Sequence, residues 1–150
     1  MADPIRASIY IDAEPDRVFA YFTRPEAMVR WMGDFARLDP TAGGEFAVDI
    51  KGVPVRGRYL EVEPPTRLLI SWGHAGSDRL PPGTSTVEVR LRPERRGTRV
   101  DIVHSDLPEP EASRHVQGWH HFLARMAEDA RAPYAAPGQI PWEGRSRRTG

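Results

Sequence analysis

The fold of this chain is decided by residues 85–104, STVEVRLRPERRGTRVDIVH. In the first half Val87, Val89 and Leu91 alternate with charged or polar residues, which is the period of a strand with one buried face. The second half alternates in the same way, and PERRG between the halves has the composition of a turn. We therefore predict two neighbouring antiparallel strands that turn one face toward the core.

The same period recurs upstream of this hairpin. Pro- and Gly-containing turns separate the apolar runs, which we predict to be strands at residues 5–11, 46–50, 55–62 and 68–72. Between the first two of these strands, Pro15 suits the first position of a short helix, and a second brief helix is predicted over 26–32.

Downstream of the hairpin the period changes to that of a helix. Apolar residues recur every three or four positions from Val116 to Ala130, which predicts the longest helix of the chain. Residues 133–150 are rich in Pro, Gly and Arg and have no sustained period. We therefore predict one domain over residues 1–132 and an irregular tail over 133–150.

This order of elements predicts an α+β fold. A curved antiparallel sheet of about six strands would wrap around the long C-terminal helix, with two short helices after the first strand. Between the helix and the sheet such a layout leaves space that side chains fill or a ligand occupies.

Composition excludes several classes of function. Lys+Arg and Asp+Glu both total 21, so no net positive charge attracts nucleic acid. The chain has no cysteine, which excludes disulfides and thiolate zinc sites. No stretch approaches the ~20 apolar residues of a membrane span, so membrane insertion is not expected and a cytoplasmic protein is the default expectation.

Several segments in order resemble one known family. They are Trp31, DPTAGGEF at 39–46, and the stretches 55–72, 85–108 and 118–126. Together they are similar to the START-like SRPBCC superfamily, and within it to the AHSA-type group related to the activator of the heat-shock chaperone ATPase. The resemblance implies a helix-grip (Bet v-like) fold around an apolar cavity that holds hydrophobic small molecules in relatives. Similar proteins include lipid binders, aromatic polyketide cyclases and chaperone activators.

Side chains predicted to face inward are the candidate ligand contacts. Trp72 shares a strand face with Leu68 and Ile70, and Trp119 lies on the apolar stripe of the helix. The predicted ligand-binding residues are Trp31, Phe46, Tyr59, Trp72, His104, Trp119 and Met126. The alternative for each is an ordinary core position, although the Tyr59 hydroxyl could supply a polar contact.

His104 is the one candidate for catalysis. It shares a strand face with Val100 and Ile102, so it could bind a polar ligand group or act as a general acid or base. Its alternative role is a hydrogen-bonded side chain at the strand end. His115, His120 and His121 are spaced by five and by one, so they cannot converge on one ion from one helix, and no metal site is expected.

The leading functional hypothesis is a protein that binds a small hydrophobic or aromatic molecule, for carriage, sensing or sequestration. A second hypothesis is a cofactor-free cyclase or dehydratase that uses His104, and a third is a chaperone-modulating interaction domain. No cofactor is expected, and a homodimer remains possible.

Overall fold

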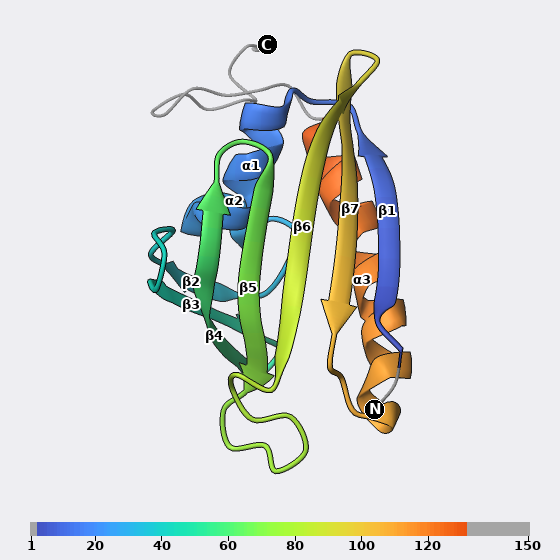
Figure 1. The fold of residues 1–150 in the computed structure, drawn as a ribbon. Coiled ribbons are helices and arrows are strands. Elements are labelled where there is room, and N and C mark those ends of the chain that lie inside the picture. The colour runs from blue at the N-terminus through green and yellow to red at the C-terminus, as the bar shows by residue number, and fades with distance from the viewer. Residues whose placement is uncertain (1–2, 132–150) are drawn as a thin grey trace, which may run out of the picture.

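A seven-stranded antiparallel sheet in the order β1-β7-β6-β5-β4-β3-β2 forms the body of the computed structural model, which describes residues 3–131 (Figure 1). The strands are β1 (Ile5–Ile11), β2 (Phe35–Leu38), β3 (Glu45–Ile50), β4 (Val53–Glu63), β5 (Arg67–His74), β6 (Ser85–Glu94) and β7 (Gly97–Ser105). The helices are α1 (Pro15–Thr23), α2 (Pro25–Met28) and α3 (Glu109–Ala130). The predicted α+β fold with a long C-terminal helix is confirmed.

The hairpin at residues 85–104 forms as its alternation predicts. Strands β6 and β7 pair with Val89 opposite Ile102 and Leu91 opposite Val100. These four side chains are buried, whereas Arg90 on the other face of β6 is exposed. The alternation therefore sets which face of the sheet meets the core.

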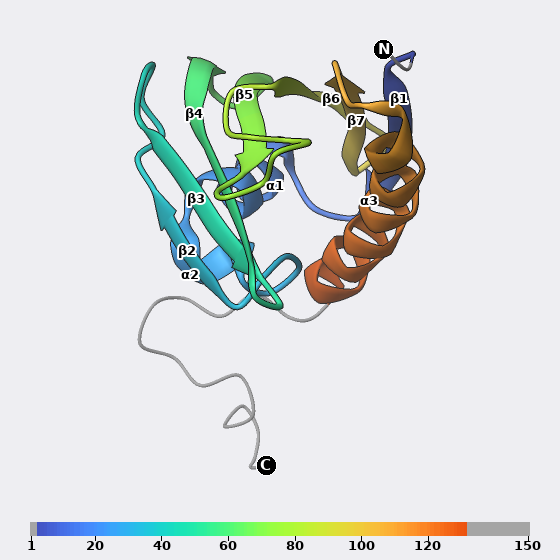
Figure 2. The same ribbon diagram turned by 90° about the horizontal axis from the view of Figure 1, so that it is seen from below.

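The sheet is strongly bent, and its concave side receives the helices. Figure 2 shows β2, β3 and β4 turned so that they face α3 across this side. Helix α3 packs against β1, and α1 packs against β6 and β7. The long helix therefore lies along one end of the concave face and does not run across its middle.

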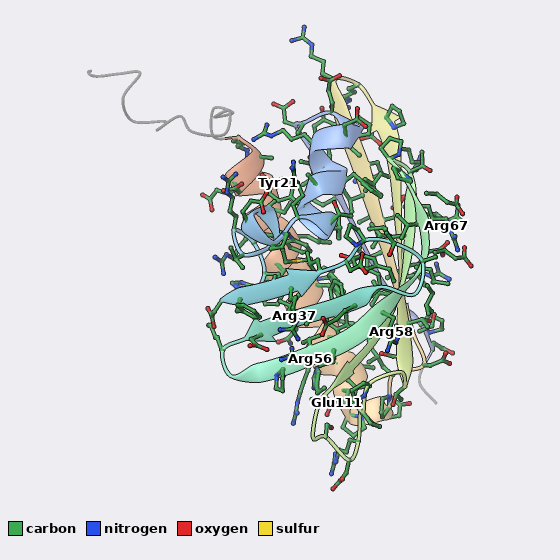
Figure 3. All side chains as sticks on the ribbon, turned by 90° about the vertical axis from the view of Figure 1, so that its left-hand side faces the viewer. Tyr21, Arg37, Arg56, Arg58, Arg67 and Glu111 are labelled. Atoms are coloured by element: carbon green, nitrogen blue, oxygen red, sulfur yellow. The ribbon has the colours of Figure 1, made fainter. Side chains whose placement is uncertain are left out.

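The C-terminal end of α3 is fastened to α1. The Tyr21 hydroxyl donates a hydrogen bond to the Asp129 carboxylate, and Arg17 donates to the backbone oxygen of Ala130. Burial, followed by the hydrogen bond to Asp129, raises the pKa of Tyr21 to about 12. These contacts fix one end of α3 at the end of the molecule where Figure 3 labels Tyr21.

Three features differ from the sequence-based predictions. Strand β2 adds a seventh, edge strand, and every second residue of its four is exposed. Helix α3 begins at Glu109 rather than at Val116, because prolines are compatible with a first helical turn and Pro108 caps this one. Helix α2 ends at Met28, before the predicted 32.

The predicted tail at 133–150 lies outside the described residues, so the domain boundary at 132 stays a prediction. Within residues 3–131 none of the helices has the length and hydropathy needed to cross a bilayer.

Glycine 57 tests the close approach of β4 and β5. An added Cβ at Gly57 would overlap the backbone oxygen of Ser71, so Gly57→Ala should lower the free energy of unfolding by about 2 kcal/mol or more. Gly118→Ala is the matched control, because a Cβ there meets nothing within 4 Å and alanine favours a helix by ~0.5–1 kcal/mol. Urea unfolding measures both variants. Equal stability of Gly57→Ala and the wild-type protein would contradict the strand spacing.

Candidate functional site

A cavity of about 440 Å³ lies between α3 and the strands that face it. Its walls are mainly apolar and come from three places in the chain. The β3–β4 hairpin supplies Ile50, Val53 and Val55, β5 supplies Trp72, and α3 supplies Trp119 and Phe122. The two indole rings lie with their centroids 5.5 Å apart. This size and lining are typical of sites that bind small organic molecules.

The cavity has a polar side at the end of the molecule where α3 begins. His74 and Ser77 come from the end of β5 and the loop after it, and Glu111, Arg114 and His115 come from the first turns of α3. Figure 3 labels Glu111 at this end, opposite to Tyr21. Arg114 lies 3.6 Å from the Glu111 carboxylate, so the two formal charges at the rim compensate each other.

Two imidazole rings stack on this polar side. The rings of His74 and His115 have centroids 5.7 Å apart and an angle of 19° between their planes. Burial lowers the pKa of His74, the proximity of His115 lowers it further, and the Glu111 carboxylate opposes this. A positive charge on His74 is therefore disfavoured.

His115 is held in one orientation by the backbone. Its Nδ1 lies 2.8 Å from the backbone oxygen of Glu111, one helical turn earlier. Because a carbonyl oxygen only accepts, Nδ1 carries the hydrogen and donates it. Within residues 3–131, Nε2 of His115 and both ring nitrogens of His74 have no hydrogen-bond partner.

His104 lies behind the cavity wall, in a continuous chain of hydrogen bonds that runs from Trp119 to the Trp72 backbone. Its Nδ1 accepts from the Trp119 indole N–H at 3.1 Å, and its Nε2 lies 2.9 Å from the Ser85 hydroxyl. Because an indole nitrogen only donates, the proton of neutral His104 sits on Nε2, which donates to Ser85. The Ser85 hydroxyl in turn donates to the backbone oxygen of Trp72.

This environment keeps His104 uncharged. The side chain is fully buried, and burial, helped by the proximity of His115 and His74, lowers its pKa to about 2. Both ring nitrogens are engaged, and the residue is not part of the cavity lining. Its hydrogen bonds hold Trp119 and the Trp72 backbone in place, so it acts on the cavity through the two tryptophans.

The Trp72 indole N–H is a buried donor without a partner. It is shielded from solvent, and no acceptor among the described residues lies within hydrogen-bond distance. A buried donor left unpaired costs ~1–3 kcal/mol, so this N–H is a local cost to the stability of the cavity wall.

The structure places two of the seven predicted ligand-binding residues in the cavity lining, namely Trp72 and Trp119. The other five are fully buried beside it or deeper in the core: Trp31, Phe46, Tyr59, His104 and Met126. The Trp31 indole and the Tyr59 hydroxyl donate to the backbone oxygens of Tyr21 and Phe22. These oxygens belong to the last turn of α1, where no helical partner is available.

Eleven of the thirteen lining residues were not among the predicted contacts, and they include His74, His115, Gly118 and Phe122. Helical spacing could have found two of them, because His115 and Phe122 lie four before and three after Trp119. His120 and His121 are exposed. Among residues 3–131 no three histidine or acidic side chains are grouped so that they could hold a metal ion.

Comparison with known proteins defines the family. The family described as "Activator of Hsp90 ATPase homolog 1-like protein" matches residues 12–130, so the chain belongs to it, and with it to the START-like SRPBCC superfamily. No relative was found among curated proteins.

Solved structures agree with this assignment. The AHSA1-like protein from Rhizobium etli is 37% identical over 91% of this chain and 88% of its own, with a TM-score of 0.70. CalU16 from Micromonospora echinospora is 31% identical over 85% of this chain and 75% of its own, with a TM-score of 0.71. An HSP90 activator from Plasmodium falciparum, at 20% identity over 88% of this chain and 99% of its own, shares the fold with a TM-score of 0.74.

The buried His104 should make stability depend on pH. An unfolded histidine has a pKa of ~6.5, whereas His104 has a pKa of about 2 in the folded protein. Between these values only the unfolded chain binds the proton, so the free energy of unfolding falls as the pH falls, by ~1.4 kcal/mol per pH unit from this residue. Urea unfolding from about pH 6 to about pH 4 should show this slope, which His104→Gln reduces and His120→Gln leaves unchanged. An unchanged slope in His104→Gln would show that His104 is protonated in the folded protein.

Proposed function

We propose that this protein binds a small, largely apolar aromatic molecule in the cavity between α3 and β3–β5, for carriage, sensing or sequestration. The observation that carries the proposal is a cavity of about 440 Å³ whose walls include two tryptophan rings. Close-packed protein interiors contain few voids larger than a water molecule, so a space of this size is not a packing defect. Aromatic walls offer a planar ligand a large apolar area to bury.

The walls are preorganised in this structure. The Trp119 indole is held by the hydrogen bond to His104, and the Trp72 ring packs against the rings of Phe46, His104 and Trp119. Since neither side chain must be ordered when a ligand enters, the entropy cost of binding is lower.

Chemistry in the same cavity is the second candidate, and one observation favours it. His74 and His115 line the cavity with ring nitrogens that no described residue occupies, as a cofactor-free acid or base requires. The base would then be His115 rather than the sequence-predicted His104, whose two nitrogens are engaged. Mass spectrometry of a ligand after incubation with the protein separates the candidates, because binding returns the compound unchanged.

Filling the cavity should weaken binding without harming the fold. Gly118 lies in α3 and lines the cavity, and a Cβ there meets no atom within 4 Å. Gly118→Leu should therefore weaken the binding of 2-methoxynaphthalene by about tenfold or more, which corresponds to ~1.4 kcal/mol. Isothermal titration calorimetry measures this affinity, and thermal melting with excess ligand provides an independent readout.

The control for this experiment is Ala124→Leu, which adds leucine at an exposed position of the same helix. It should bind 2-methoxynaphthalene as the wild-type protein does. Equal affinities of Gly118→Leu and the wild-type protein would place any binding site elsewhere. The absence of binding by the wild-type protein to a panel of one- to three-ring aromatics would overturn the proposal.

A further inference from the structure

We propose that the ligand carries an aromatic hydroxyl group and that Nε2 of His115 recognises it by accepting its hydrogen. This inference rests on the proposed function and names the chemical class of the ligand. Two observations carry it: the fixed tautomer of His115 and the compensated charge of the rim.

The backbone of α3 determines what His115 can recognise. Its Nδ1 hydrogen is directed to the backbone oxygen of Glu111 at 2.8 Å, so in the neutral ring Nε2 has a lone pair and no hydrogen. Nε2 has no partner within residues 3–131 and is not among the buried unpartnered atoms, so it is accessible. A neutral His115 therefore accepts a hydrogen bond from a ligand but cannot donate one.

The charges around the cavity disfavour an anionic ligand group. The groups that face His115 are Glu111 and Arg114 on its own helix, His74 on β5 and His104 on β7. Arg114 is paired with Glu111, and burial keeps His104 neutral. No uncompensated positive charge is left for a carboxylate, whereas a neutral hydroxyl requires none.

A hydroxyl suits the acceptor of His115 better than the other common oxygen groups. It donates a hydrogen bond toward Nε2, whereas an ether or a carboxylate only accepts. The Trp72 ring lies with its centroid 6.4 Å from that of His115, so an aromatic hydroxyl at Nε2 would lie beside an apolar ring of the wall.

Three probes with the same two rings test the inference: 2-naphthol, 2-methoxynaphthalene and 2-naphthoate. At about pH 8, where imidazole is neutral, calorimetry should show that the wild-type protein binds 2-naphthol about fivefold to tenfold more tightly than the ether, which is the effect of one hydrogen bond. His115→Phe keeps a ring in the stack with His74 but has no acceptor, so it should bind naphthol and ether equally. His120→Phe, on the exposed face of the same helix, should retain the preference.

The comparison of variants isolates the hydrogen bond, because the methyl group of the ether has the same steric effect in each protein. If naphthol and ether bind the wild-type protein equally, the hydroxyl inference fails and the proposed function stands. Tightest binding of 2-naphthoate overturns the inference in favour of an anionic ligand. If no probe binds, the hydroxyl inference fails, and the panel of one- to three-ring aromatics decides the proposed function separately.

Discussion

The architecture depends on a mismatch of widths between the sheet and the helix that covers it. Neighbouring strands are ~4.8 Å apart, so seven strands span roughly 30 Å, whereas an α-helix with its side chains is ~10–12 Å wide. One long helix therefore covers only part of the concave face. Helix α3 lies along β1, α1 covers part of β6 and β7, and the region facing β3–β5 is left for the cavity. The cavity therefore arises because the sheet is wider than the helices that cover it, and it requires no specialised loop.

The buried polar residues of the cavity wall form hydrogen bonds to its tryptophans. His104 and Ser85 are buried polar residues, which are costly unless they are hydrogen-bonded. Here they are bonded to the Trp119 indole and to the Trp72 backbone, so the Trp119 ring is held by a hydrogen bond and the Trp72 ring by its packing against Phe46, His104 and Trp119. The imidazoles that remain accessible, His74 and His115, lie toward the opening. The buried histidine and the accessible histidines are therefore separated by depth.

Hydrophobic alternation predicted six of the strands, because each of them has one buried face and a period of two is visible in the sequence. Strand β2 was missed because an edge strand of four residues has too few buried positions to show a period. The same limit applies to the site. Strand periodicity indicates that Trp72 points inward, but only the three-dimensional packing decides that Trp72 meets a cavity while Trp31 and Tyr59 bind α1.

The size of the cavity is set by a side chain that is missing. At Gly118 the long helix presents bare backbone to the cavity, and the free space there tolerates a larger residue without displacing its neighbours. Glycine lowers helix stability relative to alanine, so retaining it in a helix interior has a cost for the fold alone. A lineage could therefore shrink the accepted ligand by changing this one codon, with the scaffold unchanged.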